Sequence, residues 1–198
     1  MRHGPTALNH ESIHHDRIRG WMNVPLSPEG HKVAAVLAEK ATHSGIQDLH
    51  SSDLSRASDT AKAVGKTTGL PVSLHHALRP WNLGRLSGQP TKKVLPLIKS
   101  LVEHPDLKAP GGESFSEFMR RFLPFIGPKL ADKHLHGIVT HIRNIKALEA
   151  LVKGGGTLDK KTWDTMPTVD PGGMAYADES KFEPLSPESA SATPTAGS

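Results

Sequence analysis

The spacing of hydrophobic residues predicts two helices in the first third of the chain. Apolar side chains recur on one helical face over residues 27–42, where Ser27 can cap the helix and Pro28 suits its first position. A second amphipathic stretch covers residues 53–67 and ends just before Gly69, a residue type that is common after helix C-termini. We therefore expect two helices separated by a short connecting segment.

Later segments carry the same kinds of signal. A helix is predicted to begin at Ser114, which has capping-box spacing with Glu117, and another covers residues 144–152. Short apolar segments between the helices predict strands that end near Ser51 or lie within 70–78, 136–141 and 171–177. Helices that alternate with short strands indicate an α/β fold, a three-layer α/β/α arrangement around a mostly parallel central sheet.

Length and composition predict one domain with a tail. The chain has 198 residues, and we expect a single domain over residues 1–180. Residues 181–198 include the Ser-, Pro-, Ala- and Thr-rich run "LSPESASATPTAGS", which offers little to bury. The sequence predicts that this segment is disordered.

Charge and cysteine content exclude several function classes. The absence of cysteine excludes disulfides, thiol catalysis and cysteine-ligated zinc. The net charge of +4 comes from scattered Lys and Arg rather than one basic face, so no nucleic-acid partner is expected. No segment approaches the ~20 apolar residues of a membrane span, and none reads as a secretory signal. The sequence therefore predicts a cytoplasmic protein without a membrane partner.

Histidine is abundant, with thirteen residues, but its spacing does not indicate a metal site. Neither "HExxH" nor a comparable ligand motif is present, so no bound metal is expected.

Cationic and imidazole groups follow predicted strands at separate points in the chain. Arg2 and His3 precede a glycine turn, Arg56 follows one strand, and His141 ends another. Ligand-binding groups gather at the carboxyl ends of strands in open α/β sheets. Arginine binds phosphate through paired N–H groups, and a neutral imidazole can act as a nucleophile. This placement suggests chemistry on a phosphate group.

Several ordered segments resemble the histidine phosphatase superfamily, the phosphoglycerate mutase-like proteins. The resemblance spans most of residues 1–177 and rests on five segments: "RHGPTALN", "RIRGWMNVPLSPEG", "SSDLSRASDTA", "PGGES" and "VTH". It implies that His3 is the nucleophile and that Arg2, Arg56 and His141 surround the phosphate.

The resemblance also implies supporting roles. Asn9 and Thr140 are expected to donate or accept hydrogen bonds at the substrate, a small phosphorylated molecule, and no metal or organic cofactor is expected. Arg17, Arg19 and Arg143 are assigned to the surface or to the rim of the substrate site.

The expected general acid is missing from its usual place. Many members carry a Glu after a Leu, in a segment that resembles "LRPWNLGRLSG" here, yet Pro80 occupies that position and no carboxylate lies between Leu78 and Gly88. A positioned acid contributes about 10²–10⁴-fold to such reactions. Three explanations stay open: another group such as Glu113 serves, the leaving group is acidic, or activity is low.

The second departure is the start of the chain. In the family a hydrophobic strand leads into the Arg-His-Gly segment, whereas only Met1 precedes Arg2 here. We expect a truncated first strand, either because the given start lies downstream of the natural one or because the protein is a shortened variant.

Phosphatase activity is favoured over mutase activity. Only residues 89–112 separate the "LRPWNLGRLSG" segment from the "ES" of "GGES", a shorter interval than mutases of this family carry. Phosphoglycerate mutase-type transfer and a non-catalytic phosphate- or phosphoprotein-binding module remain as alternatives.

Overall fold

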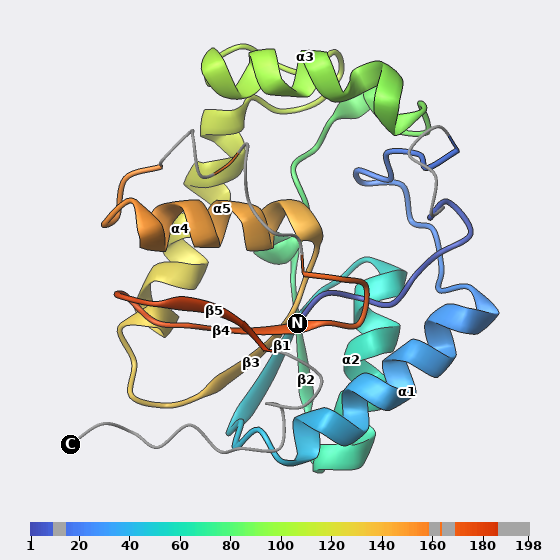
Figure 1. Cartoon of the computed structure of the whole chain (residues 1–198), viewed down its shortest axis with the longest axis vertical. Coiled ribbons are helices and arrows are strands. Elements are labelled where there is room, and N and C mark those ends of the chain that lie inside the picture. Colours follow the sequence, from blue (N-terminus) through green and yellow to red (C-terminus); the bar gives the residue numbers. More distant parts are fainter. Residues whose placement is uncertain (10–14, 159–162, 164–168, 186–198) are drawn as a thin grey trace.

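Three short parallel strands form the centre of the molecule. The computed structural model describes residues 1–9, 15–158, 163 and 169–185. The strands are β1 (Asp48–Ser52), β2 (Val72–His75) and β3 (His136–Val139). Their order is β2-β1-β3, and both neighbours run parallel to β1 (Figure 1). The expected α/β architecture with a parallel sheet is confirmed.

Five α-helices surround this sheet among the described residues. They are α1 (Pro28–Thr42), α2 (Ser55–Thr68), α3 (Thr91–Glu103), α4 (Phe115–Leu130) and α5 (Ile142–Lys153). Two short 3-10 turns, η1 (His76–Leu78) and η2 (Gly84–Leu86), lie between β2 and α3.

The helix-end signals in the sequence appear as actual caps. Ser27 Oγ accepts a 3.0 Å hydrogen bond from the Gly30 N–H, and Ser114 forms the expected capping box with Glu117. Gly69 ends α2 in the left-handed conformation, at φ +76°. By contrast, no helix was predicted for the α3 segment, whose interior contains Pro96, a residue without the N–H that helix interiors use.

Two apolar cores lie on opposite faces of the sheet. Leu49 of β1 and Val139 of β3 pack with the buried faces of α1 and α2. Ile138, the neighbour of Val139, points to the other face and packs against the core formed by α3, α4 and α5. This alternation is the normal consequence of a two-residue period in a strand. The sheet is thus the middle layer of three, as Figure 1 shows.

The first residues extend the sheet beside β3. The Met1 amino group donates to the Ile138 carbonyl at 2.8 Å, and Arg2 forms an isolated parallel bridge with Thr140. On the other side, the Arg2 N–H donates to the Gly173 carbonyl at 2.9 Å. The expected first strand is therefore present only as this short paired segment.

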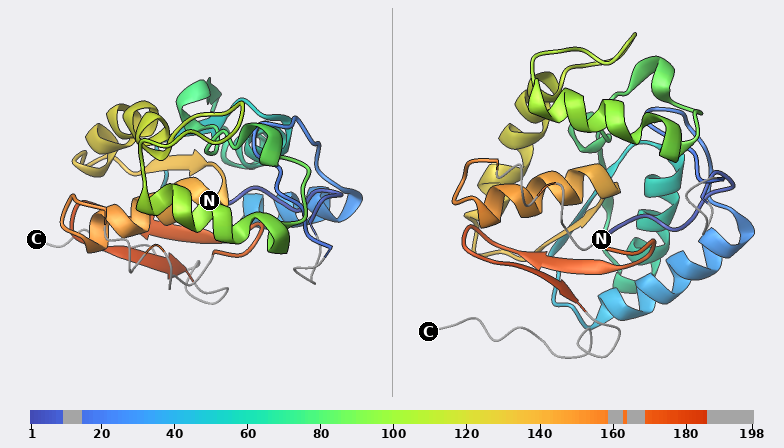
Figure 2. Two further views of the ribbon diagram at one scale, coloured as in Figure 1. Left: turned by 90° about the horizontal axis from the view of Figure 1, so that it is seen from above. Right: turned by 45° about the horizontal axis from the view of Figure 1, so that its top comes forward.

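A hairpin follows on the C-terminal side. β4 (Met174–Ala177) lies within the strand predicted at 171–177 and pairs antiparallel with β5 (Phe182–Leu185), close to the N-terminal residues (Figure 2). The expectation of disorder for 181–198 is wrong for residues 182–185, which form β5. Amino-acid composition carries no information on which backbone segments pair. Residues 186–198 lie outside the described residues. None of the helices in the described part of the chain has the length and apolar character that a membrane span requires.

Candidate active site

A small cavity opens where the carboxyl ends of β1 and β3 meet the helices that follow them. It is lined by His3, Ile18, Arg19, Gly20, Arg56, Pro80, His141, Ile142 and Arg143. These residues come from the N-terminal turn, the loop before α1, the first turns of α2 and α5, and the segment after η1. The carboxyl edge of a parallel sheet therefore gathers groups that are far apart in the sequence.

His3 lies at the cavity wall with its tautomer set by the backbone. The ring is 3% exposed, and Nδ1 lies 2.6 Å from the carbonyl oxygen of Gly4. A carbonyl only accepts, so Nδ1 carries the proton and Nε2 keeps its lone pair. Burial, and then the nearby Arg56, lowers the pKa of His3 well below its usual 6.5. His3 is therefore a neutral imidazole with a free Nε2.

His141 is the second imidazole and is also buried. Its ring meets that of His3 edge-on, with centroids 5.0 Å apart. Neither ring nitrogen of His141 has a hydrogen-bond partner among the described residues. Burial, followed by Arg56, lowers the pKa of His141 well below 6.5. A buried imidazole with two unsatisfied nitrogens is costly unless a ligand supplies partners.

Arg56, in the first turn of α2, is held by backbone oxygens rather than by a carboxylate. Its Nη1 donates to the Met22 carbonyl at 2.7 Å and its Nη2 to the Gly20 carbonyl at 2.8 Å, while Nε has no described partner. Gly20 turns through φ +47°, and an added Cβ would lie 2.3 Å from Ser87 Oγ. Burial and the nearby Arg19 lower the pKa of Arg56 to about 9, so the group remains cationic at neutral pH.

Arg19 and Arg143 add two further cations to the cavity. Arg19 donates to Asp16 Oδ1 at 2.8 Å and to the Leu8 carbonyl at 3.2 Å. Burial, followed by Arg19, lowers the pKa of Arg143 to about 10. Both arginines were expected at the surface or at the rim of the substrate site, and the structure places them in the cavity lining.

The cavity therefore has a strong preference for anions. Three guanidinium groups and two imidazoles line it, and no carboxylate does among the described residues. Among the described residues, Asp16 is bonded to Arg19 and offsets part of this charge. Arginine forks suit a tetrahedral oxyanion such as phosphate.

Three further residues expected at the substrate make hydrogen bonds within the protein, and Arg2 is also close enough to help lower the pKa of His3 and His141. Arg2 Nη1 donates to the Val169 carbonyl at 2.8 Å. Thr140 Oγ1 donates to the Leu78 carbonyl at 2.9 Å, and Asn9 Oδ1 accepts from the N–H and hydroxyl of Thr6. None of these three residues is among the described residues that line the cavity.

Glu113, the sequence candidate for the general acid, is tied elsewhere. Its Oε1 accepts from Arg121 Nη2 at 2.7 Å and from the Asn82 N–H at 2.8 Å. It is not among the cavity-lining residues, whereas Pro80 is. The geometry does not support Glu113 as the acid, and it gives the carboxylate a structural role.

Arg17 also lies outside the cavity lining, and its Nη1 donates to the Gly88 carbonyl at 2.9 Å.

The position of Arg143 in the sequence carries a signal that could have placed it in the cavity. Arg143 lies two residues after the strand-ending His141, in the first turn of a helix that begins at the site.

Comparison with known proteins identifies the family. The family model of the histidine phosphatase superfamily, branch 1, matches residues 1–168. The chain belongs to the histidine phosphatase superfamily. The expectation drawn from its sequence motifs is thereby confirmed, and the cavity described above is the candidate active site of this member.

Solved structures share the fold over most of their length. The mycobacterial glucosyl-3-phosphoglycerate phosphatase is 26% identical, with a TM-score of 0.71 over 88% of this chain and 85% of that chain. The same phosphatase in complex with VO3 is 27% identical, with a TM-score of 0.72 over 88% of each chain. A protein from Thermus thermophilus is 29% identical, with a TM-score of 0.64 over 88% of this chain and 89% of that one.

A curated relative carries a different name. The chain is 32% identical over 126 residues to a probable phosphoglycerate mutase of Yersinia pestis, a match that covers 61% of this chain and 57% of the relative. The match thus spans little more than half the length of this curated relative.

The depressed pKa values of the two buried histidines predict that stability falls in acid. Unfolded histidine takes up protons near pH 6.5, whereas folded His3 and His141 stay neutral to well below that pH. The unfolded state therefore binds more protons, and the free energy of unfolding decreases as pH falls below about 6.5. Urea unfolding at about pH 7.5 and about pH 5.5, without phosphate, measures this slope.

The double variant His3→Asn/His141→Asn isolates the contribution of the two rings, because all other titrating groups are unchanged. We expect a shallower pH dependence in the double variant than in the parent. Equal slopes would contradict the assignment of the two rings as buried and neutral.

Proposed function

We propose that this superfamily member is a phosphatase that hydrolyses a phosphomonoester through a phosphohistidine on Nε2 of His3. The observation that carries the proposal is the 2.6 Å hydrogen bond between His3 Nδ1 and the Gly4 carbonyl. It leaves the Nε2 lone pair free in a cavity that is lined with guanidinium groups.

The first chemical step transfers the phosphoryl group to His3. Nε2 attacks phosphorus, and the bond from phosphorus to the ester oxygen breaks, with its electron pair leaving on that oxygen. Water then attacks the phosphohistidine, which releases inorganic phosphate and regenerates the imidazole. Arg19, Arg56 and Arg143 stabilise the equatorial oxygens, because phosphoryl transfer depends mainly on positioning and charge.

His141 changes its role when phosphate binds. Burial and neighbouring arginines lower its pKa and keep it neutral. A phosphate dianion brings about two negative charges to the same place, which favours the protonated ring. The two ring nitrogens that lack partners then gain an acceptor in the phosphate oxygens.

Two findings support hydrolysis ahead of phosphoryl transfer between sugar acids. The mycobacterial protein whose fold matches 88% of this chain is a phosphatase, and it has been solved in complex with the oxyanion VO3. The interval from η2 to α4 holds the single helix α3, and no long insertion covers the cavity there.

Turnover of phosphate esters tests the proposal. His3→Gln removes the nucleophile, so kcat for release of inorganic phosphate should fall by at least about 10³-fold. His31→Gln changes an exposed histidine on α1 and serves as the matched control with unchanged kcat. A coupled assay for conversion of 3-phosphoglycerate to 2-phosphoglycerate runs alongside.

Three results would overturn the proposal. Retained phosphate release in His3→Gln would remove His3 as nucleophile. Efficient conversion between the two phosphoglycerates would establish the mutase. Tight phosphate binding without turnover of a broad set of esters would establish a binding module.

The lining of the cavity predicts dependence on the leaving group. No carboxylate among the described lining residues can protonate the departing oxygen, and a positioned acid contributes about 10²–10⁴-fold. We expect kcat/KM for a nitrophenyl phosphate, whose leaving group is acidic, to exceed that for an alkyl phosphate by a comparable factor. Equal values for the two esters would show that a general acid acts.

A further inference from the structure

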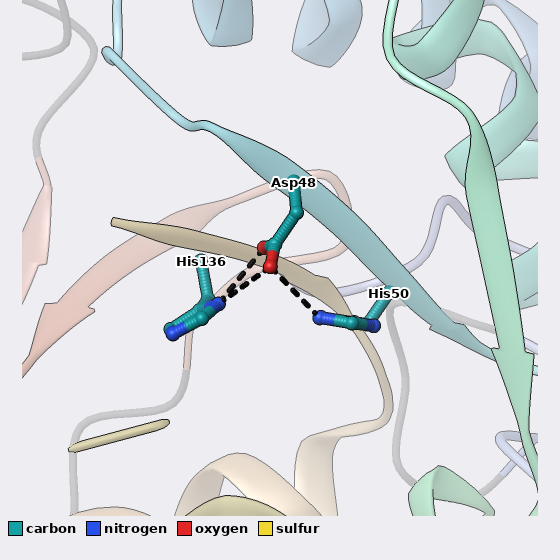
Figure 3. Close-up of side chains that lie close together, drawn as sticks. All are labelled: Asp48, His50 and His136. Atoms are coloured by element: carbon teal, nitrogen blue, oxygen red, sulfur yellow. Dashed lines mark hydrogen bonds and ion pairs between the residues drawn. The ribbon is translucent and has the colours of Figure 1, made fainter. Parts of the chain in front are cut away.

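A second cluster of titratable side chains lies at the opposite end of the sheet. Asp48 and His50 occupy positions i and i+2 of β1 and so share one face, and His136 lies directly opposite Asp48 on β3. Figure 3 shows the three side chains pointing toward one another. Both oxygens of Asp48 lie 2.8–2.9 Å from His136 Nδ1, and Oδ2 lies 3.2 Å from His50 Nε2.

His50 Nε2 is the unexplained atom of this cluster. It is buried and has no hydrogen-bond partner among the described residues, although a carboxylate oxygen is only 3.2 Å away. A hydrogen bond would need the ring N–H to point at that oxygen. A metal ion bonded to both atoms would not lie on the line that joins them, because the two bonds to a tetrahedral ion make an angle of about 109°. The Nε2 atom of His50 and the carboxylate of Asp48 are thus close enough to bind one ion together.

In both imidazoles, the ring nitrogen that does not face Asp48 contacts a neighbouring side chain. His50 Nδ1 lies 3.0 Å from His75 Nε2, and His136 Nε2 lies 3.2 Å from Asp132 Oδ2. When Asp132 accepts from Nε2–H of His136, the lone pair of Nδ1 faces Asp48. Histidine ligands commonly hold their second nitrogen in this way, by a carboxylate or another acceptor.

The surroundings are partly open and mixed in charge. The Asp48 side chain is 43% exposed, so water can reach the cluster. Phe125 of α4 packs against the rings of His50 and His75, and Lys129 lies over Phe125 with its Nζ 4.4 Å from the ring centroid. Asp132 also holds His134 at 2.9 Å. Two carboxylates thus face one ammonium, which leaves the site suitable for a cation.

We propose that Asp48, His50 and His136 form a binding site for a divalent transition-metal ion of the zinc class. Two imidazole nitrogens and one carboxylate match the ligands that Zn²⁺ takes, with water in the fourth position, and they do not match Mg²⁺ or Ca²⁺, which prefer oxygen. The ion links β1 to β3 at their amino ends, away from the cavity at the carboxyl ends. Its role is to stabilise the sheet, and this inference is independent of the proposed function.

The proposed site differs from the expectation that the histidines bind no metal. That expectation rested on ligand spacing along the sequence, whereas here strand alternation and pairing join residues 88 positions apart.

Calorimetric titration of the untagged, chelator-treated full chain with Zn²⁺ tests the proposal. We expect micromolar or tighter binding with one ion in this cluster, and a rise in Tm of roughly 5 °C at saturating zinc. Mg²⁺ should give neither effect. His50→Gln and His136→Gln should each weaken zinc binding by at least 10-fold, in line with loss of a ligand.

Matched variants separate this site from other histidines. His104→Gln alters an exposed histidine after α3 and should bind zinc as the parent does, and so should His3→Gln in the catalytic cavity. Circular dichroism and urea unfolding of His50→Gln and His136→Gln report that these variants are folded. Absence of zinc binding by the parent, or binding that survives in both ligand variants, would overturn the proposal. Loss of binding in His3→Gln alone would place the ion in the cavity and would overturn it too.

Discussion

The concentration of positive charge around two neutral imidazoles is the constraint on which the site depends. Arg19, Arg56 and Arg143 share one cavity with His3 and His141, and such a group of buried cations repels itself. The fold tolerates it because the guanidinium of Arg56 is held by backbone carbonyls and that of Arg19 by Asp16. The same repulsion, added to burial, keeps both imidazoles uncharged. A bound anion would relieve this imbalance, as the proposed function requires.

Backbone pairing at β3 sets the relation between the two imidazoles. The N–H of Thr140 donates to the Met1 carbonyl, and the N–H of His3 donates to the Thr140 carbonyl. His3 is thereby aligned beside the residue that precedes His141, and the two rings meet at 5.0 Å. The turn after His3 then brings the Gly4 carbonyl to Nδ1. Main-chain geometry thus fixes the ring of His3 with Nε2 as its free nitrogen, without a carboxylate partner.

The sequence could predict what local physics determines, and it failed where distant segments meet. Ser27, Gly69 and Ser114 mark helix ends through caps that need only neighbouring residues, and the family motifs led directly to His3, Arg56 and His141. Helix α3 was not predicted, and it forms around Pro96 because burial of Ile98 and Leu101 outweighs the cost of an interior proline. The positions of Arg19 and Arg143 depend on how a loop and a helix start pack at the sheet edge. The contact between Asp48 and His136 depends on strand register, which no linear spacing reveals.

The identity of the phosphorylated atom tests the central claim most directly. The protein is mixed with a reactive phosphate ester, quenched in alkali to preserve phosphohistidine, and studied by phosphorus NMR together with peptide mapping. The tautomer set by Gly4 predicts a phosphoryl group on Nε2 of His3. Phosphate on Nδ1 of His3, on His141 or on any other residue would contradict the account.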